Sequence, residues 1–129
     1  MSEIEIVKQL YGVHWGEISD RVKKLVPSER EARTLVKALT QHRGWRERVT
    51  AAKIIAAYQF KELAPNLVAT FRNGPEYYTC RAFSRMVAET LGSDGIQLLE
   101  EMKQGCQSDD YGNNMVKVIN EEIQSIKKA

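Results

Sequence analysis

The segment 41–48 carries the side chains best suited to binding another molecule. Its sequence, Gln-His-Arg-Gly-Trp-Arg-Glu-Arg, places Arg43, Arg46 and Arg48 around Trp45. Arginine binds carboxylates through two parallel hydrogen bonds, and tryptophan buries a large planar surface, so both are frequent at the centres of protein interfaces. The cluster therefore predicts a partner-binding site. The competing interpretation is structural: Trp45 covers the end of the core, while Arg46 and Arg48 pair with nearby carboxylates.

Aromatic residues recur after this cluster at a constant spacing. Trp45, Tyr78 and Tyr111 are separated by 33 positions in both steps, and each precedes a run of small and apolar residues. Self-similarity at roughly 20 to 50 residues is typical of stacked supersecondary units. In stacked units, equivalent positions line up along one edge. We expect Tyr78 to lie in the seam between helices and its neighbour Tyr77 to be the more exposed side chain, available to a partner.

Two acidic residues, Asp109 and Asp110, occupy the equivalent place before Tyr111. In the binding interpretation, these carboxylates meet basic groups of the partner. In the structural interpretation, they cap a helix and favour its positive end, since aspartate accepts hydrogen bonds from the free amide groups of a first turn. Both interpretations remain open from the sequence.

No catalytic or metal-binding pattern accompanies these residues. His14 and His42 are the only histidines and have no cysteine or carboxylate cluster at zinc-ligand spacing. The glycines form no phosphate-binding loop, and no serine or cysteine has a recognisable nucleophile setting. We therefore predict neither an enzyme nor a bound cofactor or metal. Cys80 and Cys106 are far apart in the sequence, and we expect reduced thiols.

Apolar residues at spacings of three and four predict helices along almost the whole chain. The breaks at Gly12, Pro27, Gly44, Pro75 and Gly105 separate many of these stripes. The helix after Gly44 contains four alanines among its apolar residues, which indicates packing against neighbours on more than one side. Helices are expected over 4–11, 18–26, 29–42, 45–58, 65–72, 78–91, 94–104 and 109–128. The predicted class is all-α.

Segments 45–73 and 76–105 resemble HEAT-like repeats, in which two helices are joined by a short turn. This resemblance implies a short α-solenoid of stacked antiparallel helix pairs with about eight helices. Residues 1–129 would form one domain, with N-terminal helices in 1–44 and repeat units at 45–73, 76–105 and 108–127.

The landmarks Trp45-Arg46-Glu47-Arg48, Tyr78-Thr79-Cys80 with Ala82-Phe83, and Asp110-Tyr111 are similar to those of a bacterial family of small helical proteins. Some members of that family resemble immunity proteins, which neutralise a toxin. The resemblance covers about residues 44–120 and implies a protein partner, one form of which is a cognate toxin. It implies no catalytic residue.

Charge is unevenly distributed although the formal net charge is only +2. Residues 21–53 hold ten basic and three acidic side chains, a surplus of seven positive charges. Residues 89–110 hold one basic and six acidic side chains, a surplus of five negative charges. Such polarity steers a partner of complementary charge, although solvated helix faces explain it equally well. Nucleic-acid binding through 21–53 is the alternative function.

The sequence gives no indication of a membrane protein. No apolar run approaches the roughly 18 residues of a membrane span, and the first residues lack the basic and apolar regions of a signal peptide. We expect a cytoplasmic protein that binds another protein without catalysis.

Overall fold

Every regular element of the structure, a computed structural model that describes residues 1–129, is helical, so the prediction of an all-α protein is confirmed. Seven helices have eight residues or more, where about eight were expected. The short one, α5, has six residues because 3₁₀ turns at 61–63 and 70–73 replace its ends. The α-helices are α1 (Glu3–Leu10), α2 (Ile18–Leu25), α3 (Glu29–Thr40), α4 (Trp45–Tyr58), α5 (Ala64–Ala69), α6 (Tyr77–Leu91), α7 (Ile96–Gln104) and α8 (Asp110–Lys128).

Side-chain caps start four of these helices. Ser2 accepts a hydrogen bond from the Glu5 amide, and Ser28 accepts one from the Glu31 amide. Caps of this kind satisfy amide groups that have no partner within the first turn. The caps of α6 and α8 are described with the site below. The helix expected over 94–104 begins later, at Ile96, because residues 92–95 form a 3₁₀ turn.

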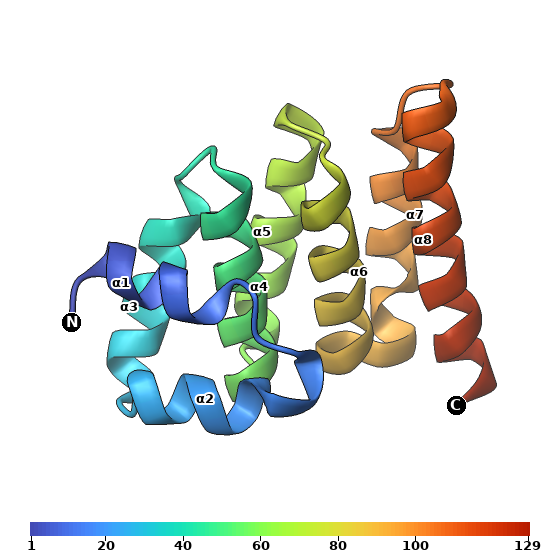
Figure 1. The fold of residues 1–129 in the computed structure, drawn as a ribbon. Coiled ribbons are helices and arrows are strands. Elements are labelled where there is room, and N and C mark those ends of the chain that lie inside the picture. The colour runs from blue at the N-terminus through green and yellow to red at the C-terminus, as the bar shows by residue number, and fades with distance from the viewer.

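The three helices that follow the repeated aromatic residues lie next to one another. Figure 1 shows α4, α6 and α8 side by side, and all three begin at the same end of the molecule. Helices α3, α5 and α7 approach that end before the chain turns back. The sequence spacing of 33 residues therefore corresponds to a real alignment: three helix starts share one edge of the molecule.

Helix α4 is at the centre of the N-terminal half. Helices α1, α2 and α3 all pack against it, and α6 packs on another side. Ten consecutive residues, from Arg48 to Ala57, are buried. Its many alanines explain this placement, because small side chains allow neighbours to approach from several directions. The prediction of an inner helix with more than one partner is confirmed.

The C-terminal helices extend the same hydrophobic core away from α4. Buried apolar residues of all parts of the chain form one continuous cluster. Helix α7 packs more closely on α8, which follows it, than on α6, which precedes it. The N- and C-termini lie at opposite ends of the array (Figure 1). Most of the acidic segment 89–110 lies in α7 and the loops beside it, on the far side of α6 from the basic helices α2 and α3 (Figure 1).

Candidate protein-binding edge

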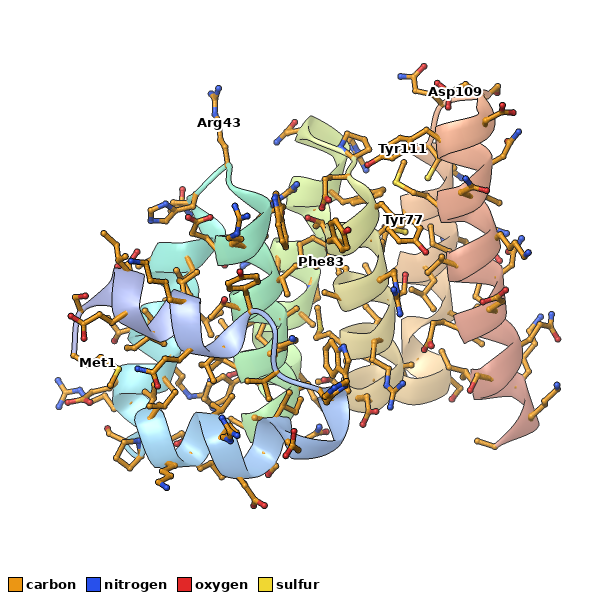
Figure 2. The ribbon with its side chains drawn as sticks, viewed as in Figure 1. Met1, Arg43, Tyr77, Phe83, Asp109 and Tyr111 are labelled. Atoms are coloured by element: carbon orange, nitrogen blue, oxygen red, sulfur yellow. The ribbon has the colours of Figure 1, made fainter.

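Aromatic side chains from three helix starts are in contact along the shared edge. The rings of Trp45 and Tyr78 are stacked with centroids 4.9 Å apart, and Tyr11 meets Trp45 edge-on at 5.6 Å. Tyr78 in turn meets Tyr77 edge-on at 5.8 Å. The Tyr111 hydroxyl accepts a hydrogen bond of 2.8 Å from the Tyr77 backbone amide. These contacts link the starts of α4, α6 and α8 into one row, as Figure 2 shows for Tyr77 and Tyr111.

The exposure of the two tyrosines at the start of α6 is the reverse of the prediction. Tyr78 was expected in the seam, but it is 56% exposed, whereas Tyr77 is half-buried. Tyr111 is 50% exposed. Tyr77 is held down because its amide binds Tyr111 and its ring packs against Tyr78. The solvent-facing aromatic surface of this edge therefore belongs to Tyr78 and Tyr111.

Arg43 and Arg46 carry the positive charge of the edge. The guanidinium of Arg46 lies over the Trp45 ring at 4.5 Å and over the Tyr11 ring at 5.4 Å. A cation over an aromatic face is attracted by the negative face of the ring. Arg43 is exposed in the α3–α4 turn and points away from the fold (Figure 2). Neither side chain forms an ion pair, so both guanidinium groups are free for a carboxylate.

Arg48 departs from the prediction because its side chain is only 4% exposed. It lies beneath the edge and donates hydrogen bonds to the backbone carbonyls of Thr70 at 3.0 Å and Gly74 at 2.6 Å. Burial lowers the pKa of its guanidinium, and the nearby Glu76 carboxylate partly offsets this effect. Arg48 therefore joins the first turn of α4 to the turn before α6. The structural interpretation holds for this arginine, with carbonyls in place of the expected carboxylate.

The acidic end of the edge combines a cap with an exposed charge. Asp109 accepts a hydrogen bond of 2.7 Å from the Gly112 amide and so caps α8, which confirms the structural interpretation of this residue. Asp110 lies in the first turn and is exposed. Glu76 has the same role at the start of α6, where it accepts hydrogen bonds from the amides of Tyr78 and Thr79. Figure 2 shows Asp109 and Arg43 at opposite corners of this side of the molecule.

We define the helix-start edge by its surface side chains: Arg43, Trp45, Arg46, Tyr77, Tyr78, Asp109, Asp110 and Tyr111. Six of the seven predicted site residues belong to it, and Arg48 is the exception. Tyr78 and Tyr111 were missing from the predicted set. The spacing of 33 residues identifies Tyr78 and Tyr111 as equivalent positions. It does not determine whether their rings face solvent.

The chemistry of the remaining groups adds no reactive centre to this edge. Both cysteines are free thiols, and Cys80 is buried. Burial, more than any neighbouring charge, raises the pKa of the Cys80 thiol to about 12, so the thiolate is strongly disfavoured. No group of three or more histidine, cysteine, aspartate or glutamate side chains has the arrangement needed to hold a metal ion.

None of the helices combines the length and apolar character needed to cross a membrane.

Comparisons with known protein families, with curated proteins and with solved structures find no match to this chain. The resemblance to HEAT-like repeats and to immunity-like proteins therefore stays a prediction.

Proposed function

We propose that the protein is a non-catalytic protein-binding module that engages its partner through the helix-start edge. The observation that carries this proposal is the row of linked aromatic rings with two tyrosines at least half exposed. Tryptophan, tyrosine and arginine dominate the binding energy of protein interfaces. The row offers all three, and its rings are already fixed by one another, so little side-chain freedom is lost on binding.

The charges on the edge suggest what kind of partner surface fits. Arg43 and Arg46 at one end favour carboxylates, and Asp109 and Asp110 at the other favour basic groups. A standard interface removes about 800 Å² from each partner. The whole chain exposes 7474 Å², so such an interface would cover roughly a tenth of its surface. In this proposal the helices form a short HEAT-like solenoid of antiparallel pairs, and the edge is one side of that array.

A cognate toxin is the sharpest form of this proposal. An immunity protein acts by covering a functional surface of its target, and it needs a rigid interface with complementary charge rather than a reactive group. In support of this form of the proposal, α4, α6 and α8 share one continuous core beneath the edge, which keeps the edge rigid. The support for a toxin in particular is the resemblance of the landmark residues.

The test is binding of a purified partner by variants of the edge. The immobilised protein is used to retain proteins from its native cell extract, mass spectrometry identifies the retained protein, and calorimetry measures Kd with both components purified. We expect Arg46→Glu combined with Tyr78→Ala to weaken binding at least tenfold. Lys117→Glu is the control, because Lys117 is exposed on α8 and outside the edge. Equal weakening by the control, or unchanged Kd for the edge variant with a retained circular dichroism spectrum, contradicts the proposal.

Nucleic-acid binding through 21–53 has less support from the structure. Two of the ten basic residues in this segment, Arg48 and Lys53, are buried and donate to backbone carbonyls. The remaining eight are divided among α2, α3, the α3–α4 turn and the first part of α4. A titration of binding against salt separates this alternative, because each phosphate neutralised contributes a slope of about −0.9 in log K against log salt.

A further inference from the structure

A polar groove opens behind the helix-start edge, between the end of α3 and the segment 63–74. Its volume is about 850 Å³, within the usual range of small-molecule sites of roughly 300 to 1,000 Å³. Only two of its twelve lining residues are apolar. Most small-molecule sites are largely apolar, so this groove is suited to a strongly polar ligand instead.

The groove is lined by basic residues and by no acidic one. Lys37, His42 and Arg43 come from α3 and its following turn, and Arg48 comes from α4. The reason lies in the sequence: residues 32–46 and 63–75, which supply all of the lining except Arg48, contain no aspartate or glutamate. Of the nearby carboxylates, Glu3 pairs with His42 at 2.9 Å and Glu76 lies near Arg48. Lys37 and Arg43 are left without an ion pair.

The hydrogen bonds and the charge of Arg48 also favour an anion in the groove. Its two terminal nitrogens bind the carbonyls of Thr70 and Gly74, both of which line the groove. These carbonyl oxygens would otherwise repel an anion. The third nitrogen, Nε, is buried and has no hydrogen-bond partner in the protein. Arg48 therefore forms no ion pair, and its charge makes the electrostatic potential in the groove more positive.

The uncharged lining indicates what the anion carries besides its charge. Asn66 and Asn73 offer amide groups, and Thr40 offers a hydroxyl, all suited to hydrogen bonds with hydroxyl groups. No phenylalanine, tyrosine or tryptophan lines the groove. The one ring in the lining, the imidazole of His42, is paired with Glu3, so the groove offers little surface on which a nucleobase could stack. Lysine and arginine are the side chains that proteins use to hold phosphate groups. We propose that this groove binds a sugar or polyol that carries more than one phosphate group. Arg43 belongs to both this groove and the helix-start edge, but the inference does not require the proposed protein partner.

The test uses calorimetry at fixed ionic strength with fructose 1,6-bisphosphate as the probe. We expect a Kd below 1 mM, at least tenfold weaker binding of pyrophosphate, and no binding of unphosphorylated fructose. Equal affinity for pyrophosphate overturns the polyol part of the proposal, and tighter binding of a single-stranded oligothymidylate overturns it in favour of nucleic acid. Absence of measurable binding of the bisphosphate at 10 mM overturns the proposal as a whole.

Two pairs of variants connect binding to the groove. Asn66→Asp changes the shape of an exposed side chain very little but places a carboxylate in the groove, and Asn114→Asp makes the same change on the exposed surface of α8. Lys37→Glu and Lys24→Glu form the second pair, since Lys24 is exposed on α2 and does not line the groove. We expect Asn66→Asp and Lys37→Glu to weaken binding at least tenfold and both controls to leave it within twofold. If the groove variant and its control change the Kd equally in each pair, the ligand does not bind in this groove. Tyr78→Ala, which affects only the helix-start edge, should leave bisphosphate binding unchanged.

Discussion

At the scale of single residues, two buried cations hold turns of this protein in place. Arg48 binds the carbonyls of Thr70 and Gly74, and Lys53 binds those of Tyr11 at 2.6 Å and Val13 at 2.7 Å. The carbonyls at the end of a helix have no partner within the helix and carry partial negative charge. The ammonium group of Lys53, which belongs to α4, reaches the end of α1 and binds two of these carbonyls at once. Both cations therefore connect α4 to parts of the chain far away in the sequence.

Lys53 makes the stability of the fold depend on pH. Burial lowers its pKa from 10.5 to about 8, so between these values the unfolded chain holds a proton that the folded chain has released. Stability contributed by this group therefore rises as the pH increases through 8. We expect the free energy of unfolding of the wild type, minus that of Lys53→Met, to increase by roughly 1 kcal/mol from pH 7 to pH 9.

Denaturation in urea at both pH values measures this difference. Cys80 acts in the opposite direction, since its raised pKa means that the unfolded chain loses its proton first as the pH passes 9. The thiol is present in both proteins, so its contribution cancels in the subtraction. A difference that stays constant or falls between pH 7 and pH 9 would show that Lys53 keeps its ordinary pKa.

Arg46 and Arg48 should respond differently to the same substitution. Arg48→Met removes two hydrogen bonds from a charged donor and leaves two carbonyls without it, so we expect a loss of about 2–3 kcal/mol in the free energy of unfolding. Arg46→Met removes only exposed contacts with aromatic rings, worth about 0.5–1 kcal/mol. Chemical denaturation compares the two variants. Equal losses would place both arginines on the surface.

At the scale of elements, the start of α8 is defined by a close approach of the α7–α8 loop. Gly112 is buried in the first turn, and a Cβ atom built there would clash with the backbone oxygen of Gln107. Asp109 caps the same turn through the Gly112 amide. The loop is therefore folded back against the helix, and this position holds Asp110 and Tyr111 at the helix-start edge.

Gly112→Ala should destabilise the protein although alanine favours helices. The gain in helix propensity is about 1 kcal/mol, but the clash is with backbone that cannot rotate away, and overpacking of this kind costs about 1–3 kcal/mol. We expect a lower melting temperature in calorimetry. Gly16→Ala is the matched control, because nothing lies within 4 Å of its Cβ position. If Gly112→Ala melts at or above the wild-type temperature, the loop is not packed as described.

At the scale of the whole molecule, one hydrophobic core supports all the helices, and charge is divided between its ends. The basic helices surround α4, while the acidic segment lies towards α7 and α8 (Figure 1). The positive surplus of 21–53 and the negative surplus of 89–110 therefore make the charge distribution of the molecule uneven. This polarity orients an approaching partner before contact is made.

A charge placed in the inner layer should unfold the whole chain. Ala56 is 6% exposed on α4, and Ala56→Asp leaves a carboxylate there without a positive partner. We expect loss of the helical circular dichroism spectrum at 25 °C, because a buried unpaired charge costs several kcal/mol and small domains are stable by only about 5–15 kcal/mol. Ala38→Asp, at an exposed position of α3, should remain helical. Similar melting temperatures for the two variants would contradict a core shared by all helices.

The sequence by itself determined the helical elements and the alignment of three of their starts. Apolar spacing, breaks at glycine and proline, and the 33-residue recurrence of aromatic residues are local or periodic features, and they identified the inner position of α4. They also brought Trp45, Tyr77 and Asp110 to one edge. Each of these conclusions depends on the period of the chain and on side chains close to one another in sequence.

Only the tertiary structure decided which of these side chains face solvent. Arg46 and Arg48 differ by about 200° around the helix axis, so one must point away from the other, but the helix alone does not say which direction is covered. Arg48 points inward because it donates hydrogen bonds to the carbonyls of Thr70 and Gly74, which lie 22 and 26 residues further along the chain. The polar groove likewise depends on two acid-free segments that meet only after folding. Burial is a property of neighbours distant in sequence, and for that reason the exposure of Tyr78 and the groove became visible only in the structure.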